Sequence, residues 1–275
     1  MTSDTAVVAP RERSLGRPGA PGRGAVHLLQ RNMLVHRRSW LVLVSGFFEP
    51  VFYLFAMGVG LSGLVGEVPG PDGQPISYAL FVAPALLAAS AMNGAVFEST
   101  TNIFFKLRFA KVYDAVLATP MRPIDIAIGE VGYALLRGGL YAVAFLAVAG
   151  VAGLLRSAIG AVLAVPATLL IGYAFAGMGM AASTFMRSWQ DFDLVQLVTL
   201  PLFLFSATFY PIDVYPGPIQ AVARFSPLYH GVEVVRACTL GTFDLSIVGH
   251  VAVLMVLGTA GMALAHRRLG HLLLR

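Results

Sequence analysis

Residues 158–182 read AIGAVLAVPATLLIGYAFAGMGMAA, a stretch of 25 residues without one charged side chain. An α-helix needs about 20 apolar residues to cross the hydrocarbon core of a bilayer. The stretch is therefore long enough to span a membrane. It contains Gly172, Gly177, Gly179 and Ala182, small residues of the kind that let neighbouring helices approach closely in lipid.

Five further stretches on either side have the same apolar character. They belong to a chain that is 57% hydrophobic and 12% charged, with a mean hydropathy of +0.76. A soluble core of 275 residues does not need so much apolar sequence, so the pattern predicts an all-α, polytopic membrane protein with six transmembrane helices. We expect one transmembrane domain over residues 24–275. The five further predicted spans are residues 41–61, 77–97, 126–150, 194–212 and 247–265.

Positive charges are distributed unevenly among the segments that join these spans. Arginines are frequent in residues 1–38, and the segment after the second span carries Lys106, Arg108, Lys111 and Arg122. By the positive-inside rule, this distribution predicts that both termini are cytoplasmic. The basic residues are expected to contact anionic lipid headgroups. Nucleic acid is not an expected partner, because its binding would need a basic face on a folded soluble domain.

Two segments of different character precede the first span. Residues 1–23 are rich in Pro, Gly, Arg and Ala, and are predicted to form a disordered basic tail. Residues 24–39 are predicted to form an amphipathic helix on the inner membrane surface, because apolar residues recur there at helical spacing among basic ones. These apolar residues are Val26, Leu29, Met33 and Leu34.

The sequence offers little that could carry catalysis or hold a cofactor. Its one cysteine, Cys238, excludes an internal disulfide. Residues 58–63 match the pattern G-x-G-x-x-G, but they end a membrane helix, whereas a dinucleotide-binding turn follows a strand. Neither lysine precedes Ser or Thr as a P-loop requires, and the 6 histidines lack metal-ligand spacing. No catalytic residue, cofactor or metal is expected.

Residues 98–125 are too polar to span a membrane, yet they are patterned. Apolar and charged side chains alternate in a way that predicts a helical cytoplasmic extension with one apolar face. Thr119-Pro120 ends it, because the residue before a proline avoids helical geometry. Two interpretations remain open at this point. The extension rests on lipid as a surface helix, or it docks a partner protein.

Three charged residues are predicted to lie inside the spans. Glu49 precedes Pro50 in the first span, whereas Glu130 and Arg137 lie seven residues apart on one face of the third. Charges at membrane depth are costly unless they are paired or reach water. We therefore expect Arg137 to pair with Glu130 or Glu49, or to meet a water-filled path.

Residues 206–246 form the longest outer segment. They are apolar for a loop but too interrupted by proline to span, and short helices are predicted near 219–225 and 232–239. A re-entrant or interfacial pair of helices fits this pattern, because irregular backbone at membrane depth must be buried in protein or lie against water.

Several short motifs lie in a fixed order along this six-span frame. They are Glu49-Pro50-x-x-Tyr53-Leu54 leading into Gly58-x-Gly60-Leu61, Phe97-Glu98, Tyr113-Asp114-Ala115-x-Leu117-Ala118-Thr119-Pro120, Gly129-Glu130, Phe209-Tyr210-Pro211-Ile212-Asp213, Ser226-Pro227-Leu228-Tyr229-His230 and Glu233-x-x-Arg236. From about residue 24 onward, the chain resembles the membrane subunits of ABC-2 type ABC exporters. Among these it is most similar to the permeases of nodulation-type lipo-oligosaccharide exporters.

The resemblance implies an assembly in the bacterial inner membrane of two permeases, identical or paralogous, and two cytoplasmic ATPase subunits. It implies that the amphipathic helix is a membrane elbow, that residues 98–120 contain a coupling helix for the ATPase, and that re-entrant helices in the outer segment close the exit. The substrate would be a lipid-linked saccharide, a lipid or a hydrophobic drug. The residues expected in ATPase coupling are Phe105, Lys106, Arg108, Lys111, Tyr113, Asp114, Leu117 and Thr119, and those expected at the outer gate are Tyr210, Pro211, Tyr229, Glu233 and Arg236.

Two other classes of protein are alternatives to an export permease. An ion-coupled secondary transporter would use Glu49, Glu130 and Arg137 as a relay, but the repeated halves common in such transporters are not evident in the sequence. A membrane enzyme acting on lipids would need catalytic groups clustered at one membrane face, and the sequence offers no such cluster.

Overall fold

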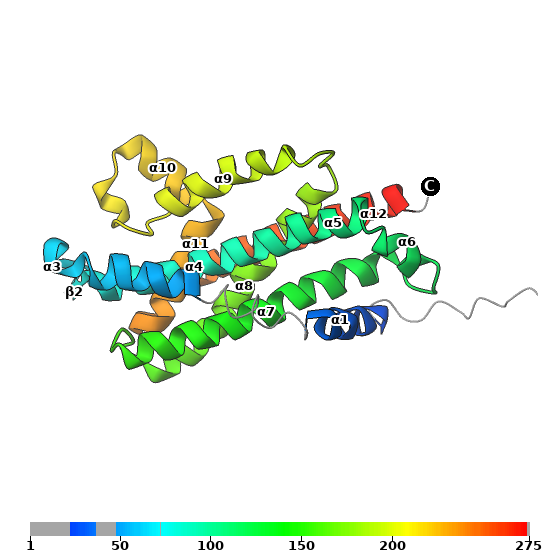
Figure 1. The fold of residues 1–275 in the computed structure, drawn as a ribbon. Helices are drawn as coiled ribbons and strands as arrows, with labels where there is room; N and C mark the ends of the chain where they lie inside the picture. Colours follow the sequence, from blue (N-terminus) through cyan, green and yellow to red (C-terminus); the bar gives the residue numbers. More distant parts are fainter. Residues whose placement is uncertain (1–22, 37–47, 72, 274–275) are drawn as a thin grey trace, which may run out of the picture.

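The computed structural model describes residues 23–36, 48–71 and 73–273 (Figure 1). Within these ranges the chain is helical apart from one short two-stranded hairpin, as an all-α membrane protein predicts. The predicted disordered tail, except for Arg23, and the start of the first predicted span at 41–47 lie outside the described residues.

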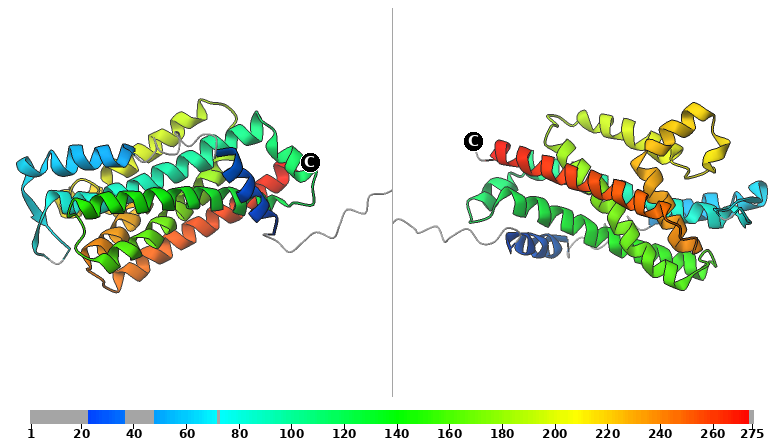
Figure 2. Two further views of the ribbon diagram at one scale, coloured as in Figure 1. Left: turned by 60° about the horizontal axis from the view of Figure 1, so that its bottom comes forward. Right: turned by 180° about the vertical axis from the view of Figure 1, so that it is seen from behind.

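Long helices run side by side along one direction and form the body of the protein (Figures 1 and 2). They are α4 (Tyr78–Phe97), α7 (Pro123–Val151), α8 (Ala158–Ser183) and α12 (Ser246–Leu273). The shorter helices are α1 (Arg23–His36), η2 (Leu54–Val59), α3 (Ser62–Val65), η3 (Glu98–Asn102), α5 (Ile103–Arg108), α6 (Val112–Leu117), α9 (Asp191–Phe205), η4 (Ile212–Val214), α10 (Gly217–Phe225) and α11 (Pro227–Leu240). Strands β1 (Glu67–Pro69) and β2 (Pro75–Ser77) pair antiparallel in the loop between the first two spans.

Among the described residues, 5 helical segments are long and apolar enough to cross a membrane. They are Phe48–Val65, Tyr78–Arg108, Pro123–Val151, Ala158–Ser183 and Ser246–Leu273, and each overlaps a predicted span. The remaining predicted span, 194–212, is helical only as far as Phe205 at the end of α9. The 15 residues of α9 extend about 22 Å at 1.5 Å per residue, which is shorter than the hydrocarbon core.

The second span does not end at Phe97-Glu98, where the sequence placed its end. The helix continues through η3 and α5 to Arg108, so the first part of the polar segment extends the span. The helix ends before Lys111, whose backbone φ of 45° lies in the left-handed region, and the next helix is α6. The helical extension after the second span is therefore confirmed.

Helix α1 is confirmed, but the face that it packs against the protein is not the one marked by the large apolar residues. Ala25, Leu28 and Asn32 are buried against α7, whereas Val26, Met33 and Leu34 are exposed. The close approach occurs where α7 carries Gly129, because a Cβ atom there would lie 2.9 Å from the Leu28 Cβ. The side chains of Val26, Met33 and Leu34 thus remain available for contact with lipid.

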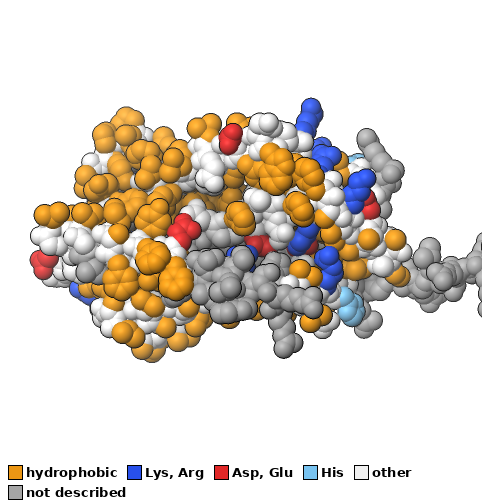
Figure 3. Space-filling view, viewed as in Figure 1, with side chains coloured by type: hydrophobic (Ala, Val, Ile, Leu, Met, Phe, Trp, Pro, Cys, Tyr) orange, Lys and Arg blue, Asp and Glu red, His pale blue; other side chains and the backbone are white. Residues whose placement is uncertain are grey.

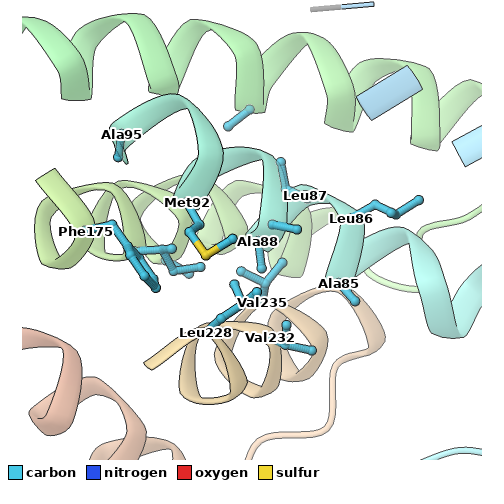
Figure 4. Close-up of a cluster of buried hydrophobic side chains, with 14 of the residues drawn as sticks. Ala85, Leu86, Leu87, Ala88, Met92, Ala95, Phe175, Leu228, Val232 and Val235 are labelled. Carbon is cyan, nitrogen blue, oxygen red and sulfur yellow. The ribbon is translucent and has the colours of Figure 1, made fainter. Parts of the chain in front are cut away.

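The outer segment forms two short helices, as predicted, and the second of them is part of the core. Helix α11 packs against α4, α8 and α12. Figure 4 shows Leu228, Val232 and Val235 of α11 facing Met92 of α4 and Phe175 of α8. This burial accounts for the high apolar content of a segment that lies between spans.

Glycines allow α8 and α12 to pack at very short distance. A Cβ atom at Gly177 would lie 2.5 Å from the carbonyl oxygen of Gly258, and one at Gly261 would lie 2.5 Å from the carbonyl carbon of Gly177. Since these neighbours are backbone atoms, a side chain could be accommodated only by separating the helices. This is the small-residue packing that the sequence of the fourth span indicates.

We expect Gly261→Ala to lower the free energy of unfolding by about 1–3 kcal/mol, because the added methyl group overpacks the α8–α12 contact. The measurement is reversible unfolding in mixed detergent micelles. Gly249→Ala on the same helix is the matched control, since a Cβ atom there meets nothing within 4 Å. The control should be neutral or slightly stabilising, because alanine favours helix over glycine. Equal effects of the two substitutions would contradict the close contact.

Candidate coupling site

Glu130 of α7 lies at the centre of a buried polar cluster. Its Oε2 atom lies 2.7 Å from Nζ of Lys106 on α5 and accepts a hydrogen bond of 3.0 Å from Nδ2 of Asn32 on α1. Its Oε1 atom accepts a hydrogen bond of 3.2 Å from the Tyr113 hydroxyl on α6. Nζ of Lys106 also donates to Oδ1 of Asn32 at 3.4 Å. One carboxylate thereby joins four helices.

The cluster is closed to solvent, since none of its four side chains belongs to a residue more than 8% exposed. Burial, followed by the charge of Glu130 and the hydrogen bond to it, raises the pKa of Tyr113 well above its ordinary value. The phenol therefore remains a hydrogen-bond donor at physiological pH. Buried charges are stable only when paired and hydrogen-bonded, so α1, α5, α6 and α7 are held in one arrangement around Glu130.

The residues predicted to couple to the ATPase fall into two groups. Some support the loop from the buried side, and the others are exposed. The side chains of Lys106 and Tyr113 point into the Glu130 cluster, and Leu117 is half-buried. These three support the loop from within. The residues that present an exposed surface are Phe105, Arg108, Lys111, Asp114 and Thr119.

An aromatic cluster ties the same segment to the loop between α8 and α9 and to the first turn of α9. Phe104 of α5 is buried, with ring centroids 5.6 Å from Trp189 and 5.3 Å from Phe192. The Phe109 ring stacks on Trp189 at 5.6 Å, and the Arg108 guanidinium donates to the carbonyl oxygen of Met186 at 3.2 Å. This cluster was not predicted from the sequence. Its only signal was the presence of aromatic residues in two separate inner segments.

Arg137 pairs with neither of the acids expected from the sequence. Its guanidinium lies 2.7 Å from Oε2 of Glu98, in the π-helical turn η3, and its Nε donates to the Tyr141 hydroxyl at 2.9 Å. The expected pairing with Glu130 or Glu49 is therefore wrong. Glu130 and Arg137 have different partners, so these contacts do not join them into one relay.

The Glu98–Arg137 pair borders a cavity of about 610 Å³ between the first span, α4, α7 and α9. Glu49 also lines the cavity, together with aromatic side chains and a few neutral polar ones. The aromatic and polar residues around it include Tyr53, Asn93, Tyr141, Trp189, Phe192, Gln196, Thr199 and Phe203. Such a cavity has apolar walls and a localised charged patch.

Arg236, predicted at the outer gate, holds three segments of the chain together. Its guanidinium lies 2.7 Å from Oε1 of Glu233, donates to the Ala207 carbonyl oxygen at 2.8 Å and lies 4.2 Å from the centre of the Phe81 ring. Ala207 has a φ of 54° directly after α9. The buried arginine therefore ties the end of α9 to α11 and α4, and Tyr210 and Pro211, predicted at the gate, follow this turn.

Next to the predicted gate residue Tyr229, the structure brings together His230 of α11 and His250 of α12. Their Nδ1 atoms lie 2.6 Å apart, and the Tyr229 ring meets both imidazoles edge-on. Burial, and then the charge of His250, lower the pKa of His230, so a neutral imidazole shares a hydrogen bond with its neighbour. Within the described ranges, no three His, Cys, Asp or Glu side chains converge as a metal site would need.

Comparison with known proteins agrees with the helical arrangement. Residues 25–240 match the ABC-2 type transporter family. The chain is 31% identical over 239 residues to Nodulation protein J of Rhizobium leguminosarum bv. viciae, covering 86% of this chain and 90% of that protein. It is 32% identical over 229 residues to the protein of the same name from Rhizobium leguminosarum bv. trifolii, covering 82% and 85%. The chain therefore belongs to the ABC-2 type transporter family, as a non-catalytic membrane permease subunit.

Proposed function

We propose that this permease is the transmembrane subunit of an ATP-driven exporter, and that it moves an amphipathic substrate out of the cytoplasm by alternating access. The substrate class would be a lipid-linked saccharide, a lipid or a hydrophobic drug. The resemblance to nodulation-type exporters favours a lipo-oligosaccharide among these, and the similarity to Nodulation protein J supports that resemblance. ATP binding and hydrolysis in separate ATPase subunits would bias the permease between two packings.

The observation that carries the proposal is the Glu130 cluster behind an exposed charged and aromatic loop. A force applied to Phe105, Arg108 or Asp114 would reach α1 and α7 through Lys106 and Tyr113, because these side chains share one buried carboxylate. Rigid transmission of this kind is what a coupling element between an ATPase and a membrane bundle needs. A surface helix that only rests on lipid would not need it.

The positions of the terminal helices and of the basic side chains support the membrane orientation predicted from the distribution of positive charge. Helix α1, helix α6 and the C-terminal end of α12 lie at the same end of the bundle (Figures 1 and 2). Figure 3 shows most of the visible basic side chains gathered at that end, while apolar side chains cover much of the remaining face. We propose that this end is cytoplasmic in a bacterial inner membrane and carries two ATPase subunits per pair of permeases.

We also propose that α9 and the turn after it form the fifth of six crossings, and that α10 and α11 form a re-entrant pair at the exit. The support is that α11 is buried against three long helices and that Arg236 anchors the turn at Ala207. The cavity beside Glu98 and Arg137 would accept the substrate, because apolar walls suit an acyl or aromatic part and the charged patch suits a polar head.

The proposed coupling surface can be tested by reversing its charges. Lys111 and Asp114 are exposed on the coupling loop, so the double substitution Lys111→Glu/Asp114→Lys preserves net charge and leaves the buried cluster intact. We expect co-purification of the ATPase subunit to be lost and ATP-dependent transport in proteoliposomes to fall at least tenfold, whereas the melting temperature of the purified permease stays unchanged.

The matched control is Glu67→Lys, a charge reversal at an exposed residue of β1 in the outer hairpin. It should leave the ATPase bound. Unchanged co-purification in the Lys111→Glu/Asp114→Lys variant would contradict the proposed docking surface. Uphill transport by the permease in liposomes without any ATPase would favour the ion-coupled alternative instead.

A further inference from the structure

A second cavity, of about 760 Å³, lies where the start of α7 meets the end of α12. Arg122, His266, Arg267 and His271 line it, and none of its described lining residues is acidic. Asp125 is the nearest acid along the chain, but it is buried and its Oδ2 atom accepts a hydrogen bond from the Arg122 backbone N–H at 3.0 Å. Basic side chains from the start of α7 and the end of α12 thus line the same cavity.

One polar atom at this cavity has no partner. Nδ1 of His266 is buried and makes no hydrogen bond within the described part of the chain. Because this nitrogen is closed to solvent, it is an unsatisfied polar atom beside the cavity and does not itself face a ligand there. The neighbouring Arg268 does not pair with it, because its guanidinium lies 4.1 Å from the centre of the Phe185 ring.

The first turn of α7 adds to the positive electrostatic potential in the cavity. Pro123 and Ile124 line the cavity and begin a helix of 29 residues. The amino end of a helix carries partial positive charge, which favours a nearby anion. Pro123 has no N–H, and the N–H groups of Asp125 and Ile126 already donate to the Arg122 carbonyl oxygen, so the contribution is the field of the helix and not a set of free donors. Two arginines and two histidines around one space, beside a helix start, are the donor set of a phosphate group.

The cavity lies at the end of the bundle that also holds α1 and α6 (Figures 1 and 2). Exposed apolar side chains lie close to it along α12, at Leu264 and Leu272. A ligand with a phosphate head and acyl chains would therefore place its head among the cations and its chains along α12. Basic pockets between transmembrane helices on the cytoplasmic side bind anionic lipid heads in this way.

We propose that the cavity between Arg122 and Arg267 binds the phosphate group of an anionic phospholipid from the inner leaflet. The lipid would fix α7 against α12 next to the coupling loop, since α6 also contacts α12. This site is separate from the transport cavity and does not depend on the proposed exporter activity.

The test measures lipid binding to the purified permease by native mass spectrometry. Phosphatidylglycerol and phosphatidylcholine of the same chain length are titrated separately, and inorganic phosphate is added in a third arm. We expect phosphatidylglycerol to bind more tightly than phosphatidylcholine. Each arginine contributes roughly fivefold to the affinity for an anionic lipid, so Arg122→Gln/Arg267→Gln should weaken phosphatidylglycerol binding by about 30-fold.

Arg156→Gln/Arg224→Gln is the matched control, because it removes the same charge from two other exposed residues, one in the loop before α8 and one in the last turn of α10. It should bind phosphatidylglycerol as the unmodified protein does. Should the double variant of the cavity not fold, Arg267→Gln alone is expected to weaken binding about fivefold, since Arg267 is exposed and its side chain supports no core contact. Equal binding of the two lipids, equal losses in both double variants, or full displacement of phosphatidylglycerol by millimolar inorganic phosphate would overturn the proposal.

Discussion

Replacing Glu130 with alanine is expected to lower the free energy of unfolding by about 3–5 kcal/mol, as removal of one partner from a buried ion pair does. The substitution leaves the Lys106 ammonium, 2.7 Å away in the native protein, buried without a counter-charge, and leaves Asn32 and Tyr113 without their acceptor. Reversible unfolding in mixed detergent micelles measures the loss. In the complex with the proposed ATPase subunit, we also expect substrate to stop stimulating ATP hydrolysis, because the coupling loop is no longer tied to α7.

Two further variants separate charge from packing at this site. Lys106→Met/Glu130→Leu removes both charges while keeping most of the volume, and should recover most of the lost stability, because neither charge remains uncompensated. Tyr113→Phe removes only one hydrogen bond and should cost about 1 kcal/mol. A Glu130→Ala protein as stable as the unmodified one, or a double variant less stable than the single one, would show that the cluster does not hold these helices together.

Arg137→Met is expected to destabilise the protein by about 3 kcal/mol, because it leaves the Glu98 carboxylate unpaired in a largely buried position. The choice of partner can be measured with a double-mutant cycle. Combining Arg137→Met with Glu98→Gln should cost less than the sum of the two changes, with a coupling of about 1–3 kcal/mol, since the residues are in direct contact.

The same cycle with Glu130→Gln or Glu49→Gln serves as the control. Neither carboxylate is bonded to Arg137, and Glu130 is already bound by Lys106, so the changes should be additive within about 0.5 kcal/mol. Coupling to Glu130 and additivity with Glu98 would restore the pairing expected from the sequence and contradict the one in the structure.

The Lys106–Glu130 and Arg137–Glu98 pairs show why the partners of buried charges could not be predicted from the sequence. Glu130 and Arg137 lie on one helix face at a spacing that suggests a pair. The continuation of the second span to Arg108 changes the arrangement, because it brings Glu98 to Arg137 and Lys106 to Glu130. Partners that are 24 and 39 residues away depend on how two helices are placed side by side, and no local pattern records that placement.

The outer segment gives a similar contrast. Its prolines and apolar runs predicted two short helices, which are present as α10 and α11. The burial of α11 against α4, α8 and α12, the anchoring of Ala207 by Arg236 and the meeting of His230 with His250 all involve residues from different segments. Helix α9 ends at Phe205, before the predicted end of the fifth span at 212, because the backbone turns at Ser206–Ala207, a change that hydropathy does not register.

The sequence alone determined that this is a helical membrane protein, where five of its long helices lie, and that a patterned polar segment follows the second span. These features follow from hydrophobicity and helix signals within about 20 neighbouring residues, which act the same way wherever the segment is placed. The tertiary structure decided which face of α1 is buried, which acid neutralises each base and where the cavities lie. Such contacts depend on the packing of distant segments, and that packing is fixed only when all the helices are assembled.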